Sequence, residues 1–414
     1  MGKHTIDELH QWQALPLNVK ILMAKERIRN CINEFGEDGV YMSFSAGKDS
    51  TVLGHIIREV CGYKNIPFVF VDVPTQYPEL KEFAKTFDNL VILKPKISFA
   101  QVCEKYGFPM ISKEVSECVY YARKYLKSIV DKLESERTIL TDRQIIGSAQ
   151  MADMLCVERR LDKENYKKVM MEIIPSVLEK AYREAKRNGG KIDCRTKMLF
   201  GELEHRDKGI VTNEYSKMYD KSRYKFFLDA PFDLCGNECC KTMKKEPLRL
   251  YARESKRVPI TAQMASESKL RTQSWLQNGC NAFDRKNPMS NPMSFWTEQD
   301  VLLYIKENNL PICSVYGEVV TDYEAMGQCE NQMSFADYGI FDNERPLLKT
   351  TGCQRTGCVL CGFGCHLEKE SRFELLKQTH PKFHNLLYIL KNNGVTYAEA
   401  IDWVNEHGGF NIKY

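Results

Sequence analysis

The residues best suited to chemistry lie between Ser43 and Ser50, where a short apolar stretch runs into small and charged residues. Gly47 allows the backbone to approach an anion closely, and a helix that begins after it would point its amide groups and positive dipole end at that anion. Lys48 supplies a mobile cation. The stretch is not a Walker loop, because it lacks the G-x-x-x-x-G spacing. The predicted phosphate-binding residues are Ser43, Ser45, Gly47, Lys48, Asp49 and Ser50, of which Lys48 and Asp49 are candidate catalytic residues.

The chain has 16 cysteines, and those in its second half are clustered. Cytosolic cysteines are seldom disulfide-bonded, so clustering indicates metal, cluster or redox chemistry. Cys239 and Cys240 are adjacent, and Cys358 and Cys361 form a C-x-x-C. Thiolates at such spacings suit an iron–sulfur cluster or tetrahedral zinc. Alternatives stay open: a self-contained site would use Cys353, Cys358, Cys361 and Cys365, and Cys280 could replace one member of the adjacent pair.

The elements around the loop are predicted from apolar spacing. Helices are expected at 6–36, 51–57 and 77–87, a short buried strand at 39–44, and further strands at 67–72 and 90–93. Alternation of strand and helix at these lengths is typical of an α/β fold with a doubly wound, mostly parallel sheet. Asp72 ends the second strand, where it could cap a helix.

The rest of the chain departs from this alternation. Residues 114–188 are rich in Lys, Glu, Arg and Leu, with few Gly or Pro, which predicts a helical insert at about 114–222. Strand-like and loop-like elements return near 225–228 and 258–262, and a helix is expected at 298–308 before a loop-rich cysteine segment. The predicted domains are an N-terminal helical segment at 1–36, a nucleotide-binding α/β domain at 37–300 that carries the insert, and a cysteine-rich and helical C-terminal region at 301–414.

Composition limits the class of protein. Hydrophobic residues make up 43% and charged residues 28%, which are ordinary values for a globular chain. No stretch approaches the roughly 18 apolar residues of a membrane helix, and the N-terminus lacks the apolar core of a secretory signal. We therefore expect a cytoplasmic protein with no membrane partner. The net charge is +4. The insert carries a modest basic excess, which is weak support for a nucleic-acid partner.

The loop resembles the Ser-Gly-Gly-Lys-Asp-Ser signature of the PP-loop ATP pyrophosphatases, with Ala46 in place of the first glycine. Members of that superfamily cleave ATP between the α and β phosphates and form an adenylated intermediate. The resemblance implies ATP with Mg²⁺ as substrate. It also implies an acidic residue near the nucleotide at the position of Asp72.

Further motifs resemble the phosphoadenosine-phosphosulfate-reductase-like family within the same superfamily. They follow the family's order over residues 36–115 and 226–365: Cys239-Cys240 with Pro247-Leu248, Thr261–Ser268 with Arg271, Asn291–Val301, Leu310-Pro311 and Gly357–Cys361. The resemblance implies a four-iron cluster on Cys239, Cys240, Cys358 and Cys361, with zinc as the alternative metal. It also implies nucleotide contacts from Glu267 and Arg271.

Two departures from the reductases favour ATP over a sulfated nucleotide. Those enzymes carry a nucleophilic cysteine in a C-terminal tail, whereas no cysteine follows Cys365 here. They have also typically lost the Lys-Asp-Ser portion of the loop, which this chain retains. Related families with an intact loop transfer sulfur to DNA or tRNA.

The leading hypothesis is therefore an ATP-pyrophosphatase-type enzyme that uses its cysteine-ligated cluster for adenylation-coupled sulfur transfer. Nucleic acid is a candidate acceptor, and a cysteine desulfurase or a thioredoxin-like protein is a candidate donor. The alternatives are a sulfonucleotide reductase and a regulator that binds adenine nucleotide without turnover.

Overall fold

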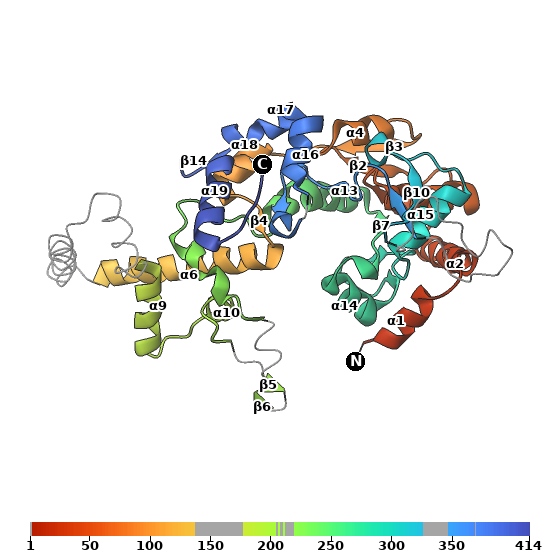
Figure 1. The fold of residues 1–414 in the computed structure, drawn as a ribbon. Coiled ribbons are helices and arrows are strands. Elements are labelled where there is room, and N and C mark those ends of the chain that lie inside the picture. The colour runs from red at the N-terminus through yellow and green to blue at the C-terminus, as the bar shows by residue number, and fades with distance from the viewer. Residues whose placement is uncertain are drawn as a thin grey trace. The chain divides into compact units, whose positions relative to one another are not determined.

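The computed structural model describes residues 2–136, 177–203, 206–207, 210–211, 219–325, 347–368 and 370–414. The chain forms two compact units. Unit 1 contains Met1–Ser98 and Cys240–Val359, and unit 2 contains Phe99–Cys239 and Leu360–Tyr414. Each unit thus joins two segments that are far apart in the sequence. In Figure 1 the red and orange start of the chain lies beside the green-to-blue second segment in unit 1.

Unit 1 is built on a six-stranded sheet with the order β3-β2-β1-β7-β9-β8. All neighbouring strands run parallel except β8 and β9, which are antiparallel. The strands are β1 (Val40–Phe44), β2 (Phe68–Val71), β3 (Leu90–Leu93), β7 (Val258–Ile260), β8 (Asn281–Ala282) and β9 (Met289–Ser290). The predicted α/β class and mostly parallel sheet are confirmed.

Helices cover both faces of this sheet. Side chains alternate along a strand, so Met42 and Phe44 of β1 share one face. They belong to an apolar core with residues of α2 and α3. Tyr41 points to the other face, where its ring packs edge-on against Tyr251 of α13, with centroids 5.2 Å apart. The helices of unit 1 are α1 (Ile6–Gln13), α2 (Leu17–Phe35), α3 (Lys48–His55), α4 (Pro78–Ala84), α13 (Glu246–Ser255), α14 (Lys269–Asn278) and α15 (Glu298–Glu307).

The predicted helix at 6–36 is divided into α1 and α2, which is a correction to the sequence analysis. Pro16 causes the break, because its ring disfavours helical backbone at the residue before it and suits the start of a new helix. Pro16 stands immediately before α2, with a φ of −58°.

A separate two-stranded sheet in unit 1 pairs β10 (Val319–Thr321) antiparallel with β11 (Leu348–Thr350).

Unit 2 is mostly helical. Its helices are α5 (Phe99–Tyr106), α6 (Lys113–Glu136), α9 (Val177–Arg187), α10 (Cys194–Leu199), α16 (Arg372–Thr379), α17 (Pro381–His384), α18 (Leu386–Ile389) and α19 (Tyr397–Gly408). Three of these lie in the predicted insert, much of which falls outside the described residues. Short pairs join β4 (Met110–Ile111) to β12 (Gly362–Phe363), β5 (Arg206–Asp207) to β6 (Ile210–Val211) and β13 (Lys391–Asn392) to β14 (Val395–Thr396).

The strand-like interpretation of 225–228 is wrong. The stretch lies in a 3₁₀ helix, Ser222–Asp229. Its aromatic residues Phe226 and Phe227 pack against Trp403 of α19, and this tertiary contact outweighs their local preference for a strand.

Among the described residues, no helix has both the length and the apolar composition needed to cross a membrane.

Candidate functional site

The predicted phosphate loop joins the end of β1 to the start of α3 in unit 1. Ala46 has a φ of 58°, a left-handed conformation, at the position where the PP-loop signature has its first glycine. Gly47 precedes the helix, and a Cβ there would lie 3.1 Å from both Tyr316 Oη and Thr356 Oγ1. The loop therefore passes close to a second segment of the chain, and Gly47 makes that approach possible.

Serine hydroxyls fix the conformation of this loop. The Ser50 hydroxyl donates to the Gly47 carbonyl oxygen at 2.9 Å. Ser45 Oγ lies 3.0 Å from Ser50 Oγ, and the Gly47 amide donates to Ser45 Oγ at 3.3 Å. The loop is thus held in place by its own side chains before any ligand binds.

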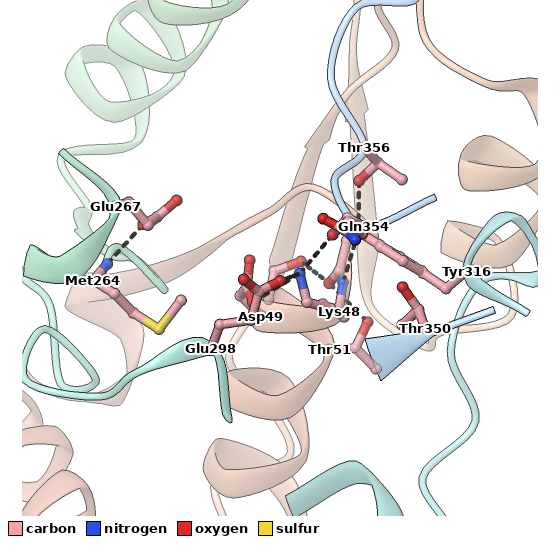
Figure 2. A network of polar contacts seen from close by, with 12 residues as sticks. Lys48, Asp49, Thr51, Met264, Glu267, Glu298, Tyr316, Thr350, Gln354 and Thr356 are labelled. Carbon is pink, nitrogen blue, oxygen red and sulfur yellow. Dashed lines mark hydrogen bonds and ion pairs between the residues drawn. The ribbon is translucent and has the colours of Figure 1, made fainter. Parts of the chain in front are cut away.

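Lys48 is the first residue of α3, and its side chain is only 4% exposed. Its Nζ lies 3.1 Å from Glu298 Oε1 and 3.8 Å from Asp49 Oδ1, and it donates to the Gln354 carbonyl oxygen at 2.9 Å. Figure 2 shows these groups converging on the ammonium. Burial raises the pKa of the Asp49 carboxyl, and the positive charge of Lys48 acts in the opposite direction.

Tyr316 places a hydroxyl at the start of α3, where helix amides have no partner within the helix. The Lys48 backbone amide donates to Tyr316 Oη at 3.2 Å, and this oxygen lies 2.7 Å from Thr356 Oγ1 (Figure 2). Burial raises the pKa of the Tyr316 hydroxyl to about 12, so the group stays protonated at neutral pH. A neutral hydroxyl can accept from the amide and donate to Thr356 at the same time.

A cavity of about 460 Å³ opens above the loop, within unit 1. Apart from the loop, its walls come from the ends of β1 and β7, from α14 and α15, and from the segment before Cys358. Its charged side chains are three cations and three carboxylates, namely Lys48, Arg271, Arg355, Asp49, Glu267 and Glu298. Such a cavity has the size and polarity for a small anionic ligand. Arg271 is paired with Glu267, and burial lowers the pKa of its guanidinium.

The structure gathers eight of the nine predicted nucleotide-binding residues at this cavity. They are Ser43, Ser45, Gly47, Lys48, Asp49, Ser50, Glu267 and Arg271. Asp72 is the exception, because it is not among the residues that line the cavity. Its carboxylate instead accepts a hydrogen bond from Lys81 Nζ of α4 at 2.6 Å. The catalytic and binding roles of the nine residues stay predictions.

Sequence reasoning gave no site role to three residues that line the cavity, namely Glu298, Tyr316 and Thr356. Glu298 lies within the Asn291–Val301 motif, which resembles the family, so its position in that motif could have indicated a role in the site. Tyr316 gave none, since a single tyrosine in a loop has no spacing that marks it.

The family model described as phosphoadenosine phosphosulfate reductase domain matches residues 39–141 and 188–362. The chain belongs to this family. A comparison with curated proteins returned no match.

A crystal structure of phosphoadenylyl-sulfate reductase from Candida auris, in a phosphate complex, is 12% identical to this member of the phosphoadenosine phosphosulfate reductase family. The match covers 70% of this chain and 82% of that chain, with a TM-score of 0.30.

The described cysteines of this phosphoadenosine phosphosulfate reductase family member are distributed over both units. Among the residues that the structure describes, no group of three or more His, Cys, Asp or Glu side chains is arranged to hold a metal ion. Cys240 and Cys358 belong to unit 1, and Cys239 and Cys361 belong to unit 2. The iron–sulfur cluster and its ligands therefore stay a prediction.

The alternate cysteines have partners of other kinds. Cys280 is buried in unit 1, where its sulfur accepts from the Ser294 hydroxyl at 3.2 Å. The Cys353 thiol lies 3.5 Å from the Tyr77 hydroxyl, also in unit 1. In unit 2, the Cys365 thiol donates to the Gly362 carbonyl oxygen, and burial raises its pKa to about 12. A thiol with so high a pKa is a poor nucleophile at neutral pH.

Proposed function

We propose that the chain binds ATP with Mg²⁺ in the cavity of unit 1 and uses it to adenylate an acceptor, as the first step of a sulfur transfer. The observation that carries this proposal is the position of Lys48. Its buried ammonium, the first amides of α3 and the serine hydroxyls of the loop all lie at one cavity. Helix amides and a fixed cation together suit a phosphate chain.

In the proposed step, one bond to phosphorus forms and one breaks. An acceptor oxygen attacks the α-phosphorus, the bond to the oxygen that bridges the α and β phosphorus atoms breaks, and pyrophosphate leaves. Lys48 would stabilise the negative charge that develops on pyrophosphate. AMP then becomes the leaving group when a sulfur nucleophile replaces the acceptor oxygen. Nucleic acid is the candidate acceptor, and a cysteine desulfurase is the candidate source of sulfur. Because the outer sulfur of a persulfide must gain two electrons to reach the level of sulfide, a thioredoxin-like dithiol would supply them and become a disulfide.

Binding measurements on anaerobically purified protein test this proposal. We expect ATP to bind more tightly than adenylylsulfate or phosphoadenylylsulfate in isothermal titration calorimetry. Lys48→Ala should weaken ATP binding by about tenfold or more, because a charge-assisted hydrogen bond contributes about 1.5–3 kcal/mol. Lys64→Ala is the matched control, since Lys64 is 71% exposed and outside the cavity. Equal ATP affinity in Lys48→Ala and wild type would reject the site.

Reduction of a sulfonucleotide is the second candidate function, and family membership favours it. One observation opposes it: no cysteine is among the described residues that line the cavity. Sulfite release from adenylylsulfate or phosphoadenylylsulfate with thioredoxin would support this reaction. Nucleotide binding without pyrophosphate or sulfite release, across candidate acceptors, would instead favour a regulator.

A further inference from the structure

Arg355 differs from the other two cations of the cavity. Lys48 is paired with Glu298 and Asp49, and Arg271 is paired with Glu267. Arg355 also lines the cavity, yet it makes no hydrogen bond or ion pair with any residue that the structure describes. It lies close enough for its charge to act on Asp49 and Arg271. Its guanidinium is therefore a cation at the cavity that is not already committed to a carboxylate.

The backbone on both sides of Arg355 is fixed to the phosphate loop and its surroundings. On one side, the Gln354 carbonyl oxygen accepts from Lys48 Nζ at 2.9 Å. On the other, Thr356 Oγ1 lies 2.7 Å from Tyr316 Oη, which itself accepts from the Lys48 amide. Both neighbours of Arg355 in the chain are thus tied directly or through one hydroxyl to Lys48 (Figure 2).

The segment is also anchored upstream. The amides of Gly352 and Cys353 donate to the carbonyl oxygens of Tyr316 and Val315, at 2.9 and 2.8 Å. A Cβ on Gly352 would lie 2.4 Å from the Val315 oxygen, so only glycine permits this approach. The base of the Arg355 side chain is held in one place while its guanidinium stays uncommitted. Such preorganisation lowers the entropy lost when a ligand binds.

We propose that Arg355 recognises an anionic group of the nucleotide that lies beyond the α-phosphate, a β- or γ-phosphate or a sulfate. This inference rests on the proposed nucleotide site and adds a specificity-determining residue to it. The planar guanidinium can bind two oxygens of a phosphate or sulfate at once, which an ammonium cannot. Arg355 would make the site select nucleoside polyphosphates and sulfonucleotides over nucleoside monophosphates.

The experiment compares ATP, adenylylsulfate and AMP binding in wild type, Arg355→Ala, Arg355→Lys and Arg285→Ala by isothermal titration calorimetry. Arg285 is exposed in unit 1 and outside the cavity, so it is the matched control. We expect Arg355→Ala to weaken binding of the preferred nucleotide, ATP or adenylylsulfate, by about 10- to 100-fold while AMP affinity stays unchanged. Arg355→Lys should recover only part of the loss. Because Arg355 is exposed, thermal unfolding of its variants should match wild type.

The outcomes separate this inference from the proposed site. Suppose that Lys48→Ala weakens nucleotide binding but Arg355→Ala leaves the affinity ratio of ATP or adenylylsulfate to AMP unchanged. The site would then stand, and the role of Arg355 would be rejected. An equal loss for AMP and ATP would also reject it, since the contact would then lie at the α-phosphate or nucleoside. If Lys48→Ala has no effect, the proposed site itself fails.

Discussion

Ala46 has a left-handed backbone conformation, which is common for glycine but which L-residues other than asparagine and aspartate seldom adopt. Its φ is 58°, and its side chain is fully buried between the end of β1 and the start of α3. A left-handed non-glycine residue costs on the order of 1 kcal/mol. The rest of the loop, including the Ser45 and Ser50 hydroxyls, must hold this conformation. The PP-loop signature has glycine at this position because glycine adopts a left-handed backbone without strain. Alanine can adopt the same backbone at a small cost in free energy.

The first prediction concerns this residue. Ala46→Gly should change the free energy of unfolding by less than about 1 kcal/mol, because relief of strain is offset by the greater freedom of the unfolded chain. Ala46→Val should destabilise by about 2 kcal/mol or more, since a β-branched side chain in a left-handed, packed position adds strain and overpacking. Urea unfolding measures both effects. An Ala46→Val variant as stable as wild type would contradict the conformation described here.

Residues of the loop could be predicted from the sequence because they are neighbours in it. Ser45, Gly47 and Lys48 meet the same anion through local geometry alone. Tyr316 and Gln354 are separated from Lys48 by 268 and 306 residues, and only the fold brings them to it. The spacing of residues in one sequence does not predict contacts between residues so far apart in the chain. Arg355 shows the same limit, because only the fold brings it to the cavity that the phosphate loop lines.

At the scale of elements, a buried ion pair joins α2 to α15. Lys20 Nζ lies 2.6 Å from Asp300 Oδ2, and the two side chains are 1% and 4% exposed. Lys20 also donates to the Gln13 carbonyl oxygen, and Asp300 accepts from Thr297 at the start of α15. The pair therefore helps to position the first turn of α15, which carries Glu298 to the cavity.

The second prediction follows from this pair. Lys20→Met should destabilise the protein by about 3–5 kcal/mol, because it leaves a buried carboxylate without its counterion. Lys85→Met is the control: Lys85 pairs with Glu82 on an exposed surface, and its loss should cost less than about 1 kcal/mol. Adding Asp300→Asn to Lys20→Met should recover part of the stability. Similar unfolding free energies for Lys20→Met and Lys85→Met would show that the pair does not hold the two helices.

Elements whose residues have strong local patterns were predicted well. β1, β2 and β3 are short apolar runs in a parallel sheet, of which β1 and β2 are buried and β3, at the edge, is partly exposed. The helices between them have regular apolar spacing. The exceptions have particular causes. Pro16 divides one predicted helix in two, and the aromatic run at 225–228 is helical because it packs on Trp403. The first cause is visible in the sequence, whereas the second depends on a partner about 180 residues away.

At the scale of the whole molecule, the order of the chain does not follow the two units. The chain passes from one unit to the other after Ser98, after Cys239 and after Val359. Two of these three points fall inside cysteine motifs. Composition does not shift at any of them, so the units could not be inferred from the sequence. The domain limits predicted at 36 and 300 stay a separate prediction, based on motifs rather than on contacts.

The cysteine motifs carry the last prediction, which belongs to the intact chain. We expect anaerobically purified protein to contain about four iron and four sulfide per chain, because paired and C-x-x-C thiolates suit a four-iron cluster. Replacing Cys239, Cys240, Cys358 or Cys361 with serine should each abolish iron binding. Variants with serine at Cys280 or Cys365 should still bind iron, since each of these thiols is buried and hydrogen-bonded within its own unit.

Cys353 decides between the two ligand sets. A self-contained site in the C-terminal segment needs Cys353 and Cys365 and can dispense with Cys239 and Cys240, so iron analysis of these variants gives opposite results for the two sets. Zinc without sulfide would reject the iron–sulfur cluster altogether. Cys353 also lies on the anchored segment that carries Arg355. If its serine variant keeps iron but loses nucleotide affinity, the segment serves the nucleotide cavity, and the cysteines after it serve the metal.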